Sequence, residues 1–548
     1  MKTQHIITTI LTLAATTSVC AVDPPAPCGA VPTERQIQWQ RLEWYGFLHY
    51  GPNTFAHIQT GYGNEDPATF NPSKFEAEQI VITYKAAGMK GLIYTAKHHD
   101  GYCLWPTKST DYNLSHSPWK NGQGDVVREL ADACKKHGML FGIYISPWDR
   151  NNAEYGRPGY LPVFHKQIEE TMTGYGDIFE IWFDGCMGGD GYYGGSCESR
   201  SINDSNTYYD FARVEEIVRS HQPDCIMWGA GEHGDCTWGG SEQGVVTYPY
   251  WNVTNGKGDM DGRFARDLPD VPAPEERWLP YEADTSIFGK KWFWDIHISK
   301  ELRSPKVLMD EVYMKSVGRG ANLILNIPIN RDGEVDTMAQ ESLLQFGEIR
   351  RKLLSRDYAL EAEGTASNVR GNDTENFGPE KLTDGDIESY WCTDDETTTG
   401  EVVLELEDTA TFDVVRVREQ IRLGQRVQNF GVDAWVDGKW VTIDAEDPNG
   451  KSIGYQVLRR VAPTTTNKVR LRITKSRACP CISELSLLNS SGAAEDFSPL
   501  KKLWLQFLSH RTIRRTCIAG GILIALLLIL RAVVAHRRRR NKASKEQA

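Results

Sequence analysis

The chain has 548 residues, a formal net charge of -12, 40% hydrophobic side chains and 10% aromatic side chains. This composition excludes a disordered or fibrous protein, and the length predicts two or three domains with sizeable hydrophobic cores. A negatively charged chain lacks the positive field that attracts phosphate backbones, so we expect no nucleic-acid partner.

The two ends of the chain predict a cellular compartment. Residues 1–21 combine Lys2, an apolar stretch and small residues before a Pro-rich segment, which is typical of a secretory signal peptide. Residues 517–535 are mostly Ile, Leu, Ala and Val and precede HRRRR, which predicts a transmembrane helix and a basic cytoplasmic tail over 536–548. Arg531 interrupts the apolar run, so a buried amphipathic helix is the alternative. We therefore expect a single-pass membrane protein of the secretory pathway, extracellular or lumenal in its bulk, with a secreted protein as the alternative.

Ten of the 12 cysteines lie between these two segments. An even number in an oxidising compartment predicts disulfide bonds, for example within the pairs Cys186/Cys197, Cys225/Cys236 and Cys479/Cys481, although sequence cannot assign the pairing. The CPC spacing of the last pair is not that of a zinc site, and we expect no metal. Five Asn-x-Ser/Thr sequons are compatible with a glycoprotein: Asn113, Asn203, Asn252, Asn372 and Asn489.

Residues 30–350 predict an α/β domain, because apolar strand-like runs alternate with amphipathic helical patterns. This alternation indicates parallel strands joined by crossover helices, and the number of repeats favours a (β/α)8-like barrel. Helices are expected around 77–87, 126–137 and 207–221, with Asp125 and Gly138 as the caps of the second. The expected strands are YGFLHYG (45–51), GLIYTAKHH (91–99), LFGIYIS (140–146), IFEIWFDG (178–185), CIMWGAG (225–231) and ANLILNI (321–327).

Residues 357–490 predict a second domain that is entirely β-structure. Helical periodicity stops, and short alternating segments such as EVVLELE, VVRVREQI and NKVRLRIT are separated by turn signals such as DG and NG. We expect a jelly-roll sandwich here, followed by a linker over 491–516.

Polar side chains follow several barrel strands, at the end where barrel enzymes carry their chemistry. Asp184 ends the strand IFEIWFDG beside Trp182 and Phe183. Such a carboxylate suits glycoside hydrolysis, which uses two carboxyl groups, although capping of the next loop is the alternative reading. His98 and His99 suggest a donor pair, but adjacent strand residues point to opposite faces. A metal-dependent amidohydrolase barrel would need more ligands at other strand ends than the chain offers.

Seven segments occur in order along the predicted barrel: GFLHYGPNTF (46–55), YTAKHHDGYCLWP (94–106), GIYISPWDR (142–150), EIWFDG (180–185), TWGGSEQG (237–244), RWLPYEADTSIFGKKWFW (277–294) and GANLILNIPINRDG (320–333). They resemble the motifs of the α-L-fucosidases of glycoside hydrolase family 29. Within them, PNTF and SPWDR resemble the branch that prefers α-1,3/1,4-linked fucose. In the β-domain, REQIRLGQRVQNFGVDAW (418–435) resembles a discoidin-type (F5/8 type C-like) domain.

The resemblance implies a retaining exo-α-L-fucosidase without a cofactor, acting on fucosylated oligosaccharides or glycoproteins. Asp184 matches the nucleophile, and Glu242 matches the general acid/base, whose pKa should be raised. Glu232 and Glu282 are the alternative acids. The implied substrate-binding residues are His49, Glu65, His98, His99, Tyr144, Trp182, Glu282 and Trp292.

Three alternatives stay open. Trp105, Trp148 and Trp182 serve either as core residues or as sugar contacts. The glycine-rich run after Asp184, CMGGDGYYGG (186–195), is either a substrate lid or a surface loop. The β-domain either binds carbohydrate or only packs under the barrel, and the whole protein could be a catalytically silent, fucose-binding surface protein. Oligomeric state is not readable from the sequence.

Overall fold

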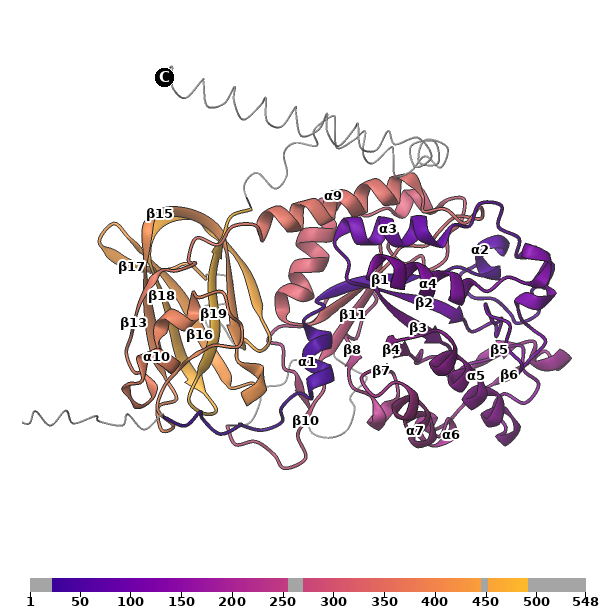
Figure 1. The fold of residues 1–548 in the computed structure, drawn as a ribbon, viewed down its shortest axis with the longest axis horizontal. Coiled ribbons are helices and arrows are strands. Elements are labelled where there is room, and N and C mark those ends of the chain that lie inside the picture. The colour runs from indigo at the N-terminus through magenta and orange to yellow at the C-terminus, as the bar shows by residue number, and fades with distance from the viewer. Residues whose placement is uncertain (1–21, 255–269, 445–451, 491–548) are drawn as a thin grey trace, which may run out of the picture.

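The structure is a computed structural model that describes residues 22–254, 270–444 and 452–490. Figure 1 shows two domains side by side, a barrel ringed by helices and a domain of β-strands. Within these described ranges, no helix combines the length and apolar character needed to span a bilayer. The predicted signal peptide (1–21), linker (491–516), transmembrane helix (517–535) and basic tail (536–548) lie outside the described residues.

The first domain is a nearly closed barrel of eight parallel strands, as the sequence predicts. Around the ring the order is β7-β4-β3-β2-β1-β12-β11-β8, and every neighbouring pair is parallel. A parallel bridge between Trp228 and Cys236 connects β7 with the residue before β8. The strands are β1 (Trp44–Leu48), β2 (Gly91–Lys97), β3 (Leu140–Ile145), β4 (Ile178–Trp182), β7 (Ile226–Trp228), β8 (Thr237–Trp238), β11 (Tyr281–Ser286) and β12 (Asn322–Asn326).

Two of these strands, β8 and β11, escaped the sequence-based assignment. β8 has only two residues, too few for a periodic signal. β11 reads YEADTS and lacks an apolar run, yet five of its six residues are buried. Its Glu282 and Asp284 are two residues apart and therefore on the same face of the strand.

The helices pack outside the barrel and connect its strands (Figure 1). Local chemistry sets their ends: the Asp125 carboxylate accepts from the Arg128 amide at 2.8 Å and caps α4, and Gly138 ends it at φ 62°. The helices of this domain are α1 (Glu34–Gln40), α2 (Pro52–Ala56), α3 (Ala77–Ala87), α4 (Val126–His137), α5 (Leu161–Gly174), α6 (Ser205–Tyr208), α7 (Phe211–His221), α8 (Pro305–Val307) and α9 (Thr337–Leu353).

Two small two-stranded antiparallel sheets supplement the barrel. One pairs β5 (Gly189–Gly191) with β6 (Glu198–Arg200), and the other pairs β9 (Val253–Thr254) with β10 (Arg277–Trp278). The first falls within the glycine-rich segment after β4, so this segment has regular structure of its own.

The described part of the second domain is built mainly from antiparallel strands and includes a short α-helix, α10 (Thr374–Phe377). The first half of β15 pairs with β13 and the second half with β19, and register shifts separate the halves. Alternating apolar residues of these strands form one buried core that includes Trp391, Phe412 and Leu471. The strands are β13 (Glu363–Ala366), β14 (Trp391–Cys392), β15 (Gly400–Glu419), β16 (Val427–Val436), β17 (Lys439–Thr442), β18 (Val457–Ser476) and β19 (Cys481–Leu488).

Ion pairs and hydrogen bonds join the two domains. The Glu43 carboxylate, before β1, contacts Arg350 of α9 at 3.0 Å and Arg418 of β15 at 3.1 Å. The N-terminal segment lies along the β-domain before it enters α1 (Figure 1), and the Arg426 guanidinium donates to the Ala26 carbonyl at 2.6 Å. The β-domain is therefore bound to the barrel at several points.

The predicted disulfides are not found among the described residues, where all ten cysteines are free thiols. Cys186 hydrogen bonds Asp184, whereas the Cys197 thiol hydrogen bonds Tyr62, so the two do not meet. Cys479 and Cys481 instead both lie beside Cys392.

Two of the five sequons, predicted as glycosylation sites, are buried in the structure. The Asn113 and Asn252 side chains are buried, the first hydrogen bonded to the Thr110 carbonyl and the second to Gln425. Neither amide is accessible to a glycosylating enzyme in the folded protein.

Candidate active site

Asp184 stands two residues beyond the end of β4, on the carboxyl-terminal side of the barrel. Its Oδ2 accepts a hydrogen bond from the Tyr144 hydroxyl at 2.9 Å, and its Oδ1 accepts from the Cys186 amide at 2.7 Å. The His99 Nε2 lies 3.8 Å from the same Oδ2. The Asp184 side chain keeps 22% of its surface exposed, so the carboxylate is held in place and open on one side.

Three histidines stand beside this carboxylate, at the ends of β1 and β2. The His98 and His99 ring centroids are 4.2 Å apart, and those of His98 and His49 are 5.6 Å apart. The expectation that the adjacent pair points to opposite faces is wrong, because β2 ends at Lys97 and strand alternation no longer applies. The His99 Nδ1 contacts the Ser146 hydroxyl at 2.7 Å, which leaves its Nε2 directed at Asp184.

Burial lowers the pKa of all three histidines, which favours the neutral form of each. Burial lowers the pKa of His49 to about 3, although its hydrogen bond to Asn326 opposes this shift. Burial also lowers the pKa of His98 well below its ordinary value. Among the described residues the His98 Nδ1 has no hydrogen-bond partner. A buried polar atom left unpaired at an open site is suited to bind a polar group of a ligand.

Trp292 supplies an apolar wall. Its ring packs on His49 at 5.2 Å and on Phe47 at 6.0 Å between centroids. Its backbone is fixed on both sides, since the amide donates to Gln59 at 2.8 Å and the carbonyl accepts from Asn326 at 2.9 Å. Asn326, at the end of β12, therefore positions both His49 and Trp292.

Glu242 lies in the segment after β8 and is exposed. The Thr285 hydroxyl of β11 donates to its backbone carbonyl at 2.8 Å. The pKa of the Cys186 thiol is raised by burial and then by the Asp184 and Glu242 carboxylates, so both carboxylates act on the same thiol. Glu232, an alternative acid, is also exposed and lies on the turn after β7.

Glu282 and Trp182 lie deeper, inside the barrel. Glu282 is fully buried and accepts from the Trp182 indole at 2.6 Å and from the Tyr45 hydroxyl. The Trp182 ring stacks on Trp228 at 3.5 Å. Burial raises the pKa of Glu282 to about 7 and raises that of its neighbour Glu180 well above the ordinary value. These residues form a layer beneath the strand-end side chains.

Glu65 holds a turn together. Its carboxylate accepts from the Gly63 amide at 3.0 Å and from the Tyr112 hydroxyl at 3.2 Å. Burial and then the Glu65 charge raise the pKa of Asp100 to about 7. Because Asp100 directly follows His99, this turn borders the histidine cluster.

Asp284 belongs to the same region, and the sequence analysis missed it. Its carboxylate accepts from the Trp238 indole at 2.6 Å, and it is 4% exposed. Burial raises its pKa well above the ordinary value, and the Glu242 charge adds to this. The signal in the sequence was the alternation of Glu282 and Asp284 in YEADTS, which places two acids on one face of an otherwise small-residue strand.

The glycine-rich segment after Asp184 packs onto the loop after β3. The Trp148 indole donates to the Tyr193 hydroxyl at 2.9 Å, and Arg150 donates to the Asp190 carbonyl at 2.6 Å. Trp148 is 8% exposed and contacts the His99 ring at 5.1 Å. The β5-β6 hairpin therefore forms one border of the site.

Comparison with known proteins identifies the family. The family model described as alpha-L-fucosidase matches residues 30–351, which is more than half of the chain. The chain belongs to the α-L-fucosidases. It is an enzyme of glycoside hydrolase family 29, and an F5/8 type C domain, matched over residues 363–485, follows the catalytic domain.

Individual relatives of this fucosidase span most of both chains. It is 34% identical to alpha-L-fucosidase 1 of Arabidopsis thaliana, over 87% of this chain and 92% of the relative. A crystal structure of a glycoside hydrolase 29 member from a rumen bacterium matches with a TM-score of 0.74 and 37% identity, over 86% and 79% of the two chains. The Ruminococcus gnavus GH29 fucosidase in complex with fucose matches with a TM-score of 0.74 and 29% identity, over 87% and 98%.

Proposed function

We propose that this fucosidase is a retaining exo-enzyme that removes terminal α-linked L-fucose through a covalent fucosyl-Asp184 intermediate. The observation that carries the proposal is the Asp184 carboxylate, which is fixed by Tyr144 and the Cys186 amide and is open on one side. A second carboxylate, Glu242, raises the pKa of the Cys186 thiol together with Asp184. Retaining glycosidases use such a pair of carboxyl groups.

In the first step, Asp184 attacks the anomeric carbon of fucose while Glu242 donates a proton to the glycosidic oxygen. The bond to the leaving sugar breaks, and an ester forms between fucose and Asp184. In the second step, Glu242 takes a proton from water, whose oxygen attacks the anomeric carbon and frees Asp184. The Tyr144 hydroxyl, hydrogen bonded to the Asp184 oxygen, orients the nucleophile in both steps.

The neutral histidines and Trp292 are suited to hold fucose. His49, His98 and His99 offer ring nitrogens to hydroxyl groups, and Trp292 offers an apolar face to the C6 methyl. Glu65 binds the substrate from the turn that its carboxylate holds together. Trp182 and Glu282 form the floor of the fucose site. The solved Ruminococcus gnavus relative, in complex with fucose, supports this substrate class.

The preferred linkage is α-1,3/1,4. This rests on the resemblance of PNTF (52–55) and SPWDR (146–150) to the branch with that preference. Rates on a Lewis-type trisaccharide, compared with α-1,2- and α-1,6-linked fucosides, test it. A faster rate on either of the latter would contradict the assignment.

The enzyme is proposed to work outside the cytosol on a membrane anchor. The support is the signal-like segment over 1–21 and the apolar segment over 517–535 with its basic flank. Membrane fractionation and protease protection of the full chain test this proposal. A secreted enzyme, or an enzyme that lies in the cytosol, would contradict it.

Carboxylate variants test the mechanism on the purified full chain. We expect Asp184→Ala to abolish release of fucose from both an aryl fucoside and a Lewis-type trisaccharide. Glu242→Gln should lower kcat/KM at least 100-fold for the trisaccharide and far less for the activated aryl fucoside, because kcat/KM reports the first step and a good leaving group needs no proton. The parent should release α-L-fucose first, observed by NMR before mutarotation.

Glu282→Gln is the matched control, because Glu282 is the buried alternative acid. We expect it to keep the ratio of rates on the two substrates. A loss selective for the trisaccharide in Glu282→Gln, and not in Glu242→Gln, would move the acid role to Glu282. If the parent binds fucosylated glycan but releases no fucose, the proposed mechanism is wrong and the protein is a catalytically silent fucose-binding protein.

A further inference from the structure

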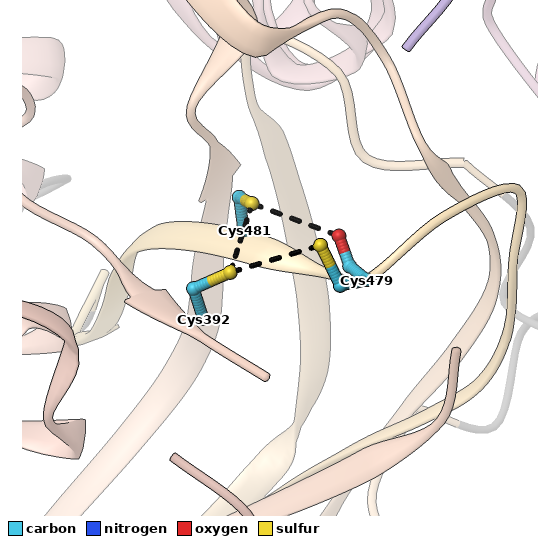
Figure 2. A group of neighbouring side chains, drawn as sticks. All are labelled: Cys392, Cys479 and Cys481. Atoms are coloured by element: carbon cyan, nitrogen blue, oxygen red, sulfur yellow. Dashed lines mark hydrogen bonds between the residues drawn. The ribbon is translucent and has the colours of Figure 1, made fainter. Parts of the chain in front are cut away.

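Three cysteines, Cys392, Cys479 and Cys481, converge inside the β-domain. Cys392 lies in β14 directly opposite Cys481 of β19, and Cys479 precedes β19 by two residues. Figure 2 shows the three sulfur atoms turned toward one another. The Cys392 Sγ is 3.4 Å from the Cys481 Sγ and 3.9 Å from the Cys479 Sγ, and all three lie within 4.8 Å of one another.

These spacings fit thiolates around a metal ion. A zinc to sulfur bond of about 2.3 Å places the sulfur atoms of a tetrahedral site about 3.8 Å apart, and those of a trigonal site about 4.0 Å apart. A disulfide would use only two of the three thiols, and its S–S bond is about 2.05 Å. The observed separations of 3.4 and 3.9 Å lie near these values, so small shifts would let all three sulfurs contact one ion.

The surroundings are dry and positively charged. The three cysteines are at most 2% exposed. The Arg426 guanidinium, 1% exposed, donates to the Cys479 Sγ at 3.1 Å and to the Cys479 carbonyl at 2.9 Å. A guanidinium beside a thiol favours the thiolate, which is the form that binds metal. Asp395 Oδ1 is 3.9 Å from the Cys479 Sγ but is paired with Arg370 at 2.6 Å.

We propose that Cys392, Cys479 and Cys481 form a structural binding site for a thiophilic metal ion, Cu⁺ or Zn²⁺, in the β-domain. Soft thiolate ligands select these ions. The site would tie β14 and the start of β19 together, next to the N-terminal segment that Arg426 also holds. The CPC spacing alone did not indicate a metal because the third ligand is 87 residues earlier in the chain.

Metal content of the full chain tests the site. Protein purified without chelator should carry about one Cu or Zn per chain by mass spectrometry of the metals, and the element found distinguishes the two ions. The stripped protein, reduced under anaerobic conditions, should take up one equivalent of Cu⁺ or Zn²⁺ with a thiolate-to-metal absorption band. Stripping should lower the Tm by a few degrees, since an ion that binds only the folded state stabilises it.

Variants separate the site from general effects. Cys392→Ser and Cys481→Ser should each weaken metal binding at least 100-fold, while fucosidase activity and circular dichroism report that the chain is folded. Cys134→Ala is the matched control, because Cys134 is a buried thiol of α4 outside the cluster, and it should keep the metal. If Cys392→Ser does not fold, thiol labelling of the parent with and without chelator gives the same information.

Two results would overturn the proposal. One is a disulfide that joins two of the three cysteines in the native protein, found by mass spectrometry of peptides. The other is three free thiols that take up no Cu⁺ or Zn²⁺ after anaerobic reduction.

Discussion

At the scale of single residues, the site depends on hydrogen bonds that orient groups already placed by the strands. Tyr144 is 1% exposed and donates to the Asp184 carboxylate at 2.9 Å. Burial and the Asp184 charge raise its pKa, so the hydroxyl stays protonated and remains a donor. Asp184 thus faces the open side of the site with a fixed orientation.

Removal of this hydroxyl should be measurable. We expect Tyr144→Phe to lower kcat/KM roughly 10- to 100-fold, because a hydrogen bond to a charged group contributes about 1.5 to 3 kcal/mol. Tyr84→Phe is the control, since the buried Tyr84 hydroxyl donates to the Ile327 carbonyl at 2.8 Å, away from Asp184. Equal losses in the two variants, measured by steady-state kinetics, would show that Tyr144 has no special role.

Asp100 should make stability depend on pH. Its folded pKa of about 7 lies above the usual value of 3.8, so the folded state holds the proton more tightly. The folded protein therefore loses stability as pH rises from about 4 to 7. Asp100→Asn has no such penalty. Its free energy of unfolding, compared with that of the parent, should therefore rise by up to about 4 kcal/mol as pH goes from about 4 to 7.

The amide introduced by Asp100→Asn has a partner. Asn53 donates to Asp100 at 3.1 Å, and the Asn53 carbonyl oxygen has no hydrogen-bond partner among the described residues, so a rotated Asn53 amide can accept from the introduced side chain. Urea unfolding at several pH values measures the difference between Asp100→Asn and the parent. A difference that does not change with pH would refute the assignment.

At the scale of elements, the barrel depends on close contact between its outer helices. Gly347 of α9 faces α3 so closely that a Cβ atom there would lie 2.1 Å from the Ala87 carbonyl oxygen. Backbone atoms cannot move aside as a flexible side chain can. α3 and α9 are the first and last large helices around the barrel, so this contact helps to close the ring.

A pair of glycine substitutions tests this contact. We expect Gly347→Ala to destabilise the fold by about 1 to 3 kcal/mol through overpacking. Gly174→Ala, in α5, meets nothing within 4 Å and should be neutral or stabilising by up to about 1 kcal/mol. Thermal unfolding of both variants measures the difference in stability between them. No difference would be found if α3 and α9 could move apart freely.

At the scale of the whole molecule, Glu43 couples the two domains. It is 8% exposed and contacts Arg350 of the barrel and Arg418 of the β-domain. The two arginines hold the pKa of Glu43 below its ordinary value despite its burial. A second carboxylate, Glu484, also contacts Arg418, at 3.4 Å.

Loss of the Glu43 charge should uncouple the domains. We expect Glu43→Gln to destabilise the protein by about 3 kcal/mol, because it takes a charged partner from the buried Arg418 and from the partly buried Arg350, and to split calorimetric unfolding into two transitions. The matched control is Glu34→Gln, which removes an exposed interdomain pair with Arg422 and should change little. A single unshifted transition in Glu43→Gln would contradict the coupling.

The linear sequence by itself determined most of the architecture. Apolar runs such as GLIYTAK and caps such as Asp125 and Gly138 specify strands and helices through local periodicity and hydrogen bonding. Loss of helical periodicity after the barrel indicated the β-domain, and Asp184 was evident as a carboxylate that directly follows a buried strand.

Only the tertiary structure decided which side chains meet. It turned His98 and His99 toward one site, buried Glu282 beneath Trp182, and brought Asp284 beside Trp238. It also joined Cys392 to Cys479 and Cys481 across 87 and 89 residues and left the expected disulfides as free thiols. The physical reason is that local patterns fix the conformation of a segment, whereas strand pairing and the end of each strand fix which distant side chains come into contact.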